Sequence, residues 1–168
     1  FISEITYATV EEHAHKASAL ILFERLETAC SAVTRLKQTP VAAVELLDRA
    51  SLRSVEAKPG MPESLATLPD DGAALIVETR AATAAALAVR VEAIAAALAD
   101  FALARPLRFA TDPREAAALW NVRKGMFPAV GAVRKRGTSV IFEDIAVPTD
   151  VLAPAALDLQ ALFRKHRY

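Results

Sequence analysis

The 168-residue sequence predicts an α+β protein, in which a ferredoxin-like antiparallel sheet with helices packed on one face is followed by an extra helix–strand–helix. Three observations lead to this prediction. Short, mostly apolar runs typical of buried strands recur along the chain, and patterns with helical spacing separate them. Their order is strand–helix–strand–strand–helix–strand. Two split βαβ units in that order form a single antiparallel sheet.

Composition restricts the classes of function. Lys plus Arg equals Asp plus Glu at 20 each, so long-range attraction to nucleic acid is not expected. No apolar run reaches the roughly 18 residues of a membrane span. The single cysteine, Cys30, excludes an internal disulfide and fits a reducing compartment, and a small core residue is its favoured interpretation. We therefore expect a cytoplasmic location, including a peripheral one at the inner membrane face.

The N-terminal region opens with the loosely alternating residues 2–10, which predict an edge strand or an extended lead-in. His13 and His15 follow, two residues apart. On a strand both rings would share a face, which permits a metal site, but no third ligand is near and linker residues are the favoured interpretation. The elements predicted next are a strand at 17–23, a helix at 26–37, a strand at 41–47, a short helix at 48–55 and a loop at 58–72.

The second half repeats the alternation of strand and helix. An alanine-rich stretch carries Leu87, Val91, Ile94 and Leu98 on one stripe and predicts a long amphipathic helix. The sequence around Asp112-Pro113 is typical of a helix start. The predicted elements are a strand at 73–79, a helix at 81–101, a strand at 107–110, a helix from 111 to 125, a fifth strand at 138–147 and a last helix at 150–165.

The segment 120–148 places polar residues where ordinary packing does not require them. Arg123 and Lys124 lie among apolar residues, and Glu143-Asp144 interrupts a strand-like run. These residues could build a polar pocket, or they could be a helix, a loop and a half-solvated strand. No glycine-rich phosphate loop, GxSxG motif, cysteine pair or cluster with metal-ligand spacing occurs in the sequence. A domain that lends side chains to a site shared with another domain fits this inventory better than a self-contained enzyme.

The stretch WNVRKGMFPAVGAVRKRGTSVIFEDIAVPTDVL resembles the C-terminal domain of FAD-linked oxidases of the vanillyl-alcohol oxidase type. It is most similar to the branch of D-lactate dehydrogenases and the glycolate oxidase flavin subunit. The resemblance rests on Trp120 and Arg123 of a Trp-x-x-Arg helix, on the turn 125–131, and on the Glu-Asp-x-x-x-Pro strand end at 143–148.

The resemblance implies that residues 1–168 are the substrate-binding or cap domain of a larger enzyme. That enzyme would oxidise a small 2-hydroxy acid, of the D-lactate or glycolate type, to the 2-oxo acid. FAD would be bound mainly by an N-terminal flavin-binding domain, and the catalytic histidine motif would follow residue 168. The chain alone is therefore expected to be inactive and to bind no FAD. The resemblance does not specify the electron acceptor, and it allows an iron–sulfur cluster or a metal elsewhere in the parent.

Four residues are carried over as substrate-binding candidates: Arg123, Lys124, Glu143 and Asp144. Arg123 comes first, because a guanidinium fork pairs with both oxygens of a carboxylate, although a surface arginine is an equal alternative. Glu143 and Asp144 alternate, so only one can face the core side of a sheet. It would need a partner such as Arg123 or Lys124, and a structural salt bridge is its favoured interpretation. Trp120 is predicted to be a core or interface residue that could contact the flavin side.

Large exposed apolar patches usually mark contacts between domains. We expect one around Trp120, Met126 and Phe127, covered in the parent by the flavin domain. The main alternative function is a non-catalytic ferredoxin-like module for ligand sensing or oligomerisation, since this fold serves many functions.

Overall fold

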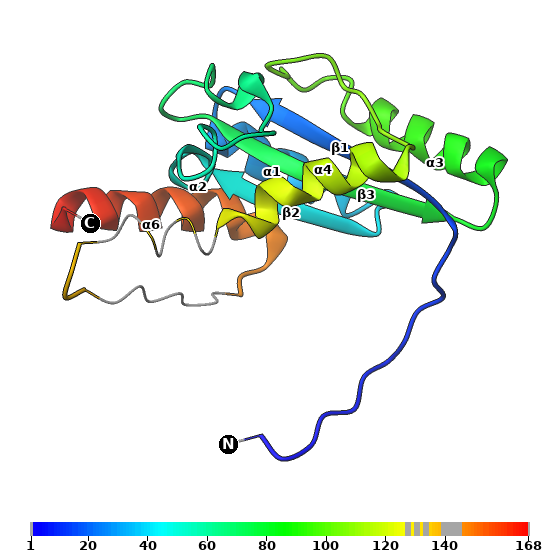
Figure 1. The fold of residues 1–168 in the computed structure, drawn as a ribbon, viewed down its shortest axis with the longest axis horizontal. Coiled ribbons are helices and arrows are strands. Elements are labelled where there is room, and N and C mark those ends of the chain that lie inside the picture. Colours follow the sequence, from blue (N-terminus) through cyan, green and yellow to red (C-terminus); the bar gives the residue numbers. More distant parts are fainter. Residues whose placement is uncertain (1, 127–128, 130–131, 133–134, 139–145, 168) are drawn as a thin grey trace.

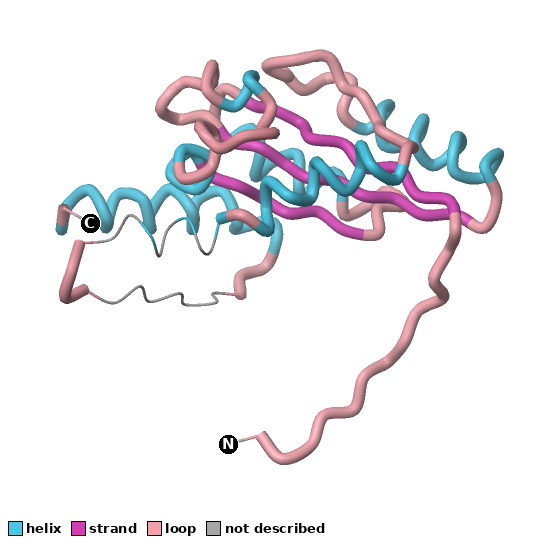
Figure 2. The backbone as a smooth tube through the Cα atoms, viewed as in Figure 1, coloured by secondary structure: helices cyan, strands magenta, loops and turns pink. Residues whose placement is uncertain are grey.

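The computed structural model describes residues 2–126, 129, 132, 135–138 and 146–167, and these form an α+β domain. Its sheet consists of β1 (His15–Phe23), β2 (Ala43–Asp48) and β3 (Ala73–Ala81). The strand order is β1-β3-β2, and both pairings are antiparallel. This is the order expected for a split βαβ unit, and the predicted fold class is confirmed (Figures 1 and 2).

The central strand β3 explains why the sheet forms around it. Its residues alternate between two faces, and both faces are covered, so nearly all of its side chains are buried. The register places Phe23 of β1 and Asp48 of β2 opposite Ala73, and His15 opposite Ala81. Small residues at both ends of β3 and Leu75, Ile76 and Val77 between them fit a strand packed on two sides.

One face of the sheet is covered by α1 (Leu26–Leu36) and α3 (Ala84–Ala97), the two helices of the ferredoxin-like unit. A further helix, α6 (Leu152–His166), lies against α1 and follows the short 3-10 helix η2 (Thr149–Val151). The buried residues of this core are all apolar; they are Ala19, Ile21, Phe23, Leu26, Ala29, Cys30, Ala32, Leu36, Ala73, Leu75, Val77, Ile94 and Leu98. This face is therefore devoted to packing, and burial raises the pKa of the Cys30 thiol.

The opposite face is covered by the short helix α2 (Arg49–Arg53), the loop with η1 (Glu63–Leu65), and the extra helix α4 (Pro113–Lys124). Figure 1 shows α4 running across the sheet on this side. The second apolar cluster lies here; its buried members are Leu22, Leu47, Leu52, Val55, Leu65, Leu68, Ala74, Ile76, Val122 and Ala129. The loop predicted at 58–72 thus contributes core side chains as well as turns.

The fourth strand predicted at 107–110 is wrong in its extent, because only an isolated antiparallel bridge between Ser18 and Ala110 forms there. A further backbone hydrogen bond joins Ala104 N–H to the Leu22 carbonyl at 2.8 Å. Between these two contacts, residues 104–110 advance by six positions while β1 advances by only four, from Ser18 to Leu22. The segment 104–110 therefore cannot keep a continuous register with β1. Pro106 also lacks an N–H group for the ladder. The segment nevertheless occupies the sheet edge beside β1, where the predicted topology places it.

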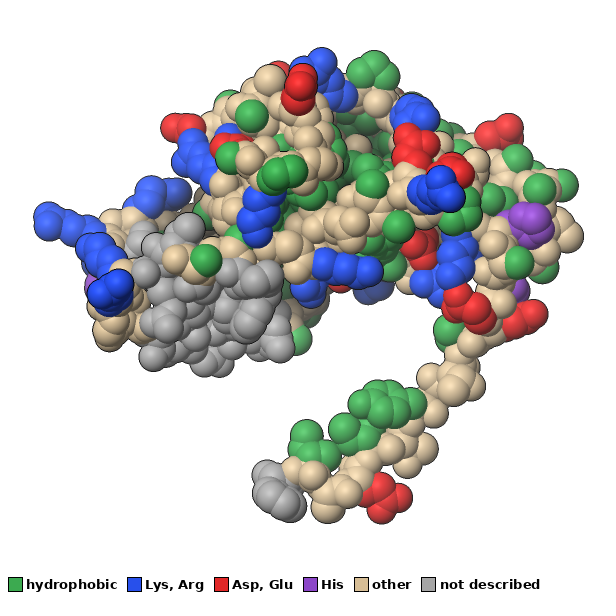
Figure 3. All heavy atoms as spheres, viewed as in Figure 1, with side chains coloured by type: hydrophobic (Ala, Val, Ile, Leu, Met, Phe, Trp, Pro, Cys, Tyr) green, Lys and Arg blue, Asp and Glu red, His purple; other side chains and the backbone are tan. Residues whose placement is uncertain are grey.

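Residues 2–12 form an extended arm without regular structure, the second of the two predicted alternatives. Its Ile2, Ile5, Tyr7 and Val10 side chains are exposed. Figure 3 shows this arm standing away from the body of the domain, with acidic and basic side chains gathered where it joins. The helix predicted at 81–101 begins later, at Ala84, because Thr83 caps it. The strand predicted at 138–147 lies largely outside the described residues.

Candidate functional site

Helix α4 begins and ends at the residues that its sequence signals specify. The Asp112 carboxylate accepts hydrogen bonds from the backbone N–H groups of Arg114 and Glu115, both at 3.0 Å, and Pro113 occupies the first turn. These bonds satisfy amides that would otherwise have no partner in the helix. Gly125 follows the last helical residue. The helix therefore has a fixed length and presents Trp120 and Lys124 on neighbouring turns of one side.

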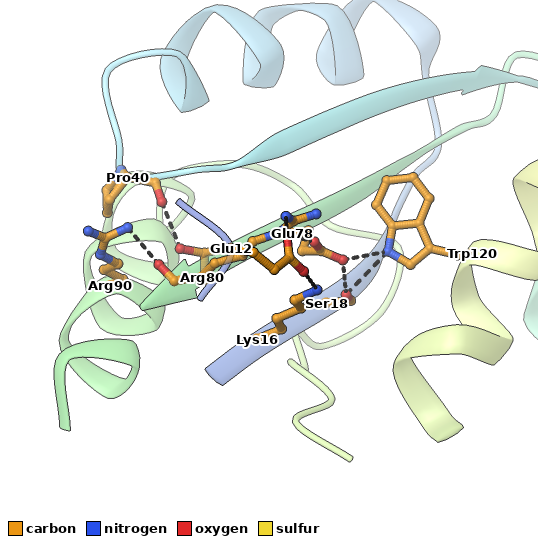
Figure 4. A network of polar contacts seen from close by, with 9 residues as sticks. Glu12, Lys16, Ser18, Pro40, Glu78, Arg80, Arg90 and Trp120 are labelled. Carbon is orange, nitrogen blue, oxygen red and sulfur yellow. Dashed lines mark hydrogen bonds and ion pairs between the residues drawn. The ribbon is translucent and has the colours of Figure 1, made fainter. Parts of the chain in front are cut away.

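Beneath α4, the face of β1 and β3 changes from apolar to polar along the strands. Glu78 continues the face of Ala74 and Ile76, and Ser18 lies directly opposite it on β1. The Glu78 side chain is only 9% exposed, so its charge needs partners. Its Oε2 accepts hydrogen bonds from the Ser18 hydroxyl at 3.1 Å and from the Trp120 indole N–H at 2.9 Å (Figure 4).

Arg80, two residues along the same face, holds the other oxygen of Glu78. Its Nε lies 2.6 Å from Glu78 Oε1, and its Nη1 lies 2.9 Å from Glu12 Oε2. Glu12 also pairs with Lys16. Four charged residues therefore alternate in sign as Lys16, Glu12, Arg80 and Glu78. The hydrogen bond with Glu78 raises the pKa of Arg80, and Lys16 followed by Arg80 lowers the pKa of Glu12.

A hollow of ≈ 400 Å³ opens between α4 and the start of β1. Its lining residues are Ala14, Lys16, Glu78, Thr111, Pro113, Ala116, Ala117, Trp120 and Lys124. A larger hollow of ≈ 560 Å³ adjoins it, but apolar side chains of α3 and Phe109 make up much of that wall. The smaller hollow is the candidate site, because two ammonium groups, a buried carboxylate and an indole meet there.

The substrate-binding residues predicted from the sequence differ in their position relative to the hollow. Lys124 lines the hollow. Arg123 does not; its side chain is 51% exposed, and its Nε lies 3.5 Å from Glu45 Oε2 on β2. Glu143 and Asp144 lie outside the described residues.

Trp120 occupies the place predicted for a core residue, packed partly against the second apolar cluster. Met126 is also half-buried against that cluster, and Phe127 lies outside the described residues. Among the described residues, the exposed large apolar side chains belong instead to the arm, to Val89 of α3, and to η2 and α6, where Leu162 and Phe163 are about half exposed. For Trp120 and Met126, the prediction of an exposed patch is therefore wrong.

Sequence reasoning missed Glu78, Ser18, Arg80 and Lys16. A signal existed for Glu78: it stands two and four residues after Ile76 and Ala74, so strand alternation places its carboxylate on a buried face. The partners could not be found in this way. Ser18 and Trp120 lie 60 and 42 residues from Glu78 in the sequence, and only the strand register and the position of α4 bring them together.

Comparison with protein families decides what kind of domain carries this site. Residues 12–168 match the family described as FAD linked oxidases, C-terminal domain. The chain belongs to this family. It is thus a domain of an FAD-dependent oxidoreductase, and its partner is a flavin-binding domain. A search of curated proteins finds no match to the chain.

The start of α4 in this FAD-linked oxidase domain does not fit the pyrophosphate of FAD. A dinucleotide pyrophosphate is usually held by free backbone N–H groups at a helix N-terminus. At α4, the helix that borders the hollow, Asp112 already occupies two of these groups and adds a negative charge. Within the described residues, no three His, Cys, Asp or Glu side chains gather to hold a metal ion.

The helices described in this oxidase domain were compared with the length and apolar character of a membrane span. Among them, none combines the length and the apolar character needed to cross a bilayer.

Proposed function

We propose that this domain binds a small 2-hydroxy acid for an FAD-dependent dehydrogenase or oxidase of the D-lactate or glycolate type. The observation that carries the proposal is the hollow beside α4, whose lining includes Lys124 of the helix and Lys16 of β1. A 2-hydroxy acid presents a carboxylate to such groups, and ammonium and guanidinium groups bind carboxylates through charge-assisted hydrogen bonds. The resemblance of residues 120–148 to that branch of the family supports the same substrate class.

In this proposal the end of α4 anchors the substrate carboxylate. Lys124 contributes an ammonium group that makes no ion pair among the described residues, whereas Lys16 is already paired with Glu12. Arg123 exchanges its long contact with Glu45 for the substrate, since a contact at 3.5 Å between exposed groups contributes little stability. Lys124 binds the carboxylate in the hollow, and Arg123, which lies outside the lining, joins it once released from Glu45. The carbon that bears the hydroxyl group then faces the flavin of the partner domain.

The roles of Glu143 and Asp144 stay predictions. We propose that one of them contacts the substrate or pairs with a cation of α4, as alternation along a strand allows for one of the two.

The test uses the full-length parent enzyme with D-lactate and glycolate as substrates, and 2-hydroxyglutarate as a larger dicarboxylate. Arg123→Ala should weaken transition-state stabilisation by about 2–4 kcal/mol, which lowers kcat/KM roughly 30- to 1000-fold, with little change in flavin content. Arg123→Lys should restore only part of the loss, because an ammonium group is a point charge rather than a fork. Lys124→Gln should lower kcat/KM by about tenfold through the loss of one charged contact.

Lys37→Gln is the matched control, since Lys37 is an exposed lysine at the end of α1 on the opposite side of the sheet. It should leave kcat/KM unchanged. Parental kinetics in both the Arg123 and the Lys124 variants would contradict this assignment of the carboxylate site. A parent enzyme that turns over none of the 2-hydroxy acids would instead show that this oxidoreductase acts on another class of substrate.

A further inference from the structure

Trp120 is held from below by a carboxylate that belongs to the central strand. Its indole N–H has two oxygen neighbours, Glu78 Oε2 at 2.9 Å and the Ser18 hydroxyl at 3.3 Å. Figure 4 shows the Trp120 indole of α4 pointing with its nitrogen toward these two residues on β1 and β3. Trp120 and Glu78 both line the hollow. The contact therefore joins the helix that would carry the substrate ligands to the most buried strand of the sheet.

The position of the Glu78 carboxylate is fixed from three directions. Arg80 holds Oε1 at 2.6 Å, while Ser18 and Trp120 share Oε2. Arg80 is itself fixed, because Glu12 pairs with its guanidinium and Arg90 donates to its backbone carbonyl at 2.6 Å. A buried carboxylate with charged and neutral donors makes strong hydrogen bonds, since the surroundings screen them weakly. A neutral amide at this position would keep the shape and lose the ion pair.

Apart from the 3.5 Å contact between the exposed Arg123 and Glu45 side chains, the remaining described contacts of α4 with the sheet are apolar and less directional. Val122 is fully buried in the second cluster, and Met126 packs partly against it. Apolar packing limits how far the helix can lie from the sheet, but it specifies rotation about the helix axis less sharply than a hydrogen bond does. Lys124 lies one turn after Trp120, so a rotation of α4 would displace its ammonium group from the hollow.

We propose that Glu78 is a positioning residue, which fixes α4 through Trp120 and thereby sets the affinity of the site for the hydroxy acid. This inference rests on the proposed function for its substrate. It assigns no contact between Glu78 and the substrate. The carboxylate acts through the indole, and the charge of Glu78 matters because it orders Arg80, Ser18 and Trp120 around one point.

The kinetic test compares three variants of the parent enzyme. Glu78→Gln should raise KM for the 2-hydroxy acid about tenfold while kcat changes less than about twofold, because a displaced Lys124 binds the substrate carboxylate more weakly in the ground state and the transition state alike. Trp120→Phe keeps an aromatic ring without the N–H donor and should give a similar rise. The double variant should be no worse than the more impaired single variant, since both changes weaken the same Glu78–Trp120 contact: Trp120→Phe removes its donor, and Glu78→Gln leaves an uncharged acceptor no longer ion-paired with Arg80.

Glu56→Gln is the matched control. Glu56 pairs with the buried Arg49 at 2.7 Å, so this change also removes a partly buried carboxylate–guanidinium pair, but it lies outside the lining of the hollow. It should lower the melting temperature and leave KM within about twofold of the parent value. Equal KM effects in the Glu56 and Glu78 variants would overturn the inference, as would additive effects in the double variant.

A second measurement does not depend on turnover. Trp120 is the only tryptophan of this chain, so its fluorescence reports the contact directly. In the 168-residue chain, Glu78→Gln should raise the acrylamide quenching constant of Trp120 about twofold or more, and Glu56→Gln should leave it unchanged. If the parent oxidises no 2-hydroxy acid but quenching rises as expected, the proposed function fails and the positioning role stands. Unchanged quenching in Glu78→Gln overturns the positioning role itself.

Discussion

The two faces of the sheet are built from alternate residues of the same strands, yet they differ in chemistry. On the face under α1 and α3, β3 contributes Ala73, Leu75 and Val77 to a core whose buried members are all apolar. On the face under α4, the same strand contributes Ala74 and Ile76, and then the carboxylate of Glu78. The first face continues with the buried Thr79, whose hydroxyl donates to the Pro40 carbonyl at 2.7 Å, and it buries no charge, whereas the second face ends in a charged network.

The difference shows where a small domain can place a site without losing its core. Burying a charge is unfavourable unless it is paired and hydrogen-bonded. Glu78 meets that condition through Arg80, Ser18 and Trp120. The apolar face can supply stability because it carries no such group, and the α4 face can therefore hold a hollow with charged walls.

The largest expected effect concerns the apolar face. Leu75→Ala should lower the free energy of unfolding by about 2–5 kcal/mol, because Leu75 is fully buried and its truncation leaves a cavity. Chemical denaturation of the chain measures this. The control is Leu159→Ala on α6, where the side chain is 36% exposed and the loss should be clearly smaller. If Leu75→Ala lowered the free energy of unfolding by less than about 1 kcal/mol, the face under α1 and α3 would not be the stabilising core described above.

A smaller effect compares the helices that cover the two faces. Asp112 caps α4 with two hydrogen bonds, and Thr83 caps α3 with one, from Ala86 N–H at 3.2 Å. Replacing either cap with alanine should lower the free energy of unfolding by about 1 kcal/mol. Only Asp112→Ala should also raise KM in the parent, since α4 carries the proposed substrate ligands. A KM effect of equal size from Thr83→Ala would show that the site depends on general stability.

The smallest effect is a pH dependence at the edge of the polar network. Hydrogen bonding to Lys16, together with the charges of Lys16 and Arg80, lowers the pKa of Glu12 below its ordinary value of 4.5 in the folded domain. The unfolded chain therefore takes up this proton first as the pH falls. The stabilisation by Glu12 is present above pH 4.5 and is lost as the pH falls through its folded pKa.

Chemical denaturation of the 168-residue chain and of its Glu12→Gln variant, from pH 6 to pH 3, measures the free energy of unfolding of each. The stability difference should shrink toward acid pH. A difference that grows toward acid pH would contradict the assignment. The effect should be small, because Glu12 is exposed and solvent screens its pairs.

Local signals explain how much of the fold could be predicted. The Asp112-Pro113 start and Gly125 end of α4 follow from residues next to one another, and so does the cap of α2, where Asp48 accepts from Ser51 N–H at 2.9 Å. The edge segment beside β1 failed as a strand because its register depends on spacing between two distant contacts, at Ala104 and Ala110. No local pattern reports such spacing.

The residues of the site likewise fall into those that the sequence could identify and those that only the structure shows. Trp120 and Lys124 were singled out because they belong to one conspicuous helix, and both line the hollow. Glu78 and Ser18 come from two strands whose local patterns resemble ordinary buried strands. Their meeting under Trp120 is a consequence of strand pairing and helix docking, so sequence spacing could not predict it. Glu143 and Asp144 lie outside the described residues, and their assignment as substrate ligands stays a prediction.

The central claim is that the polar face under α4 receives the substrate carboxylate. A structure of the full-length parent enzyme with a bound 2-oxo acid product, such as pyruvate or glyoxylate, tests it most directly. The product carboxylate should lie in the hollow within hydrogen-bonding distance of Lys124 or Arg123, with the Trp120 indole still bonded to Glu78. A product bound between the flavin and another part of this domain, with the hollow left to solvent, would contradict the account.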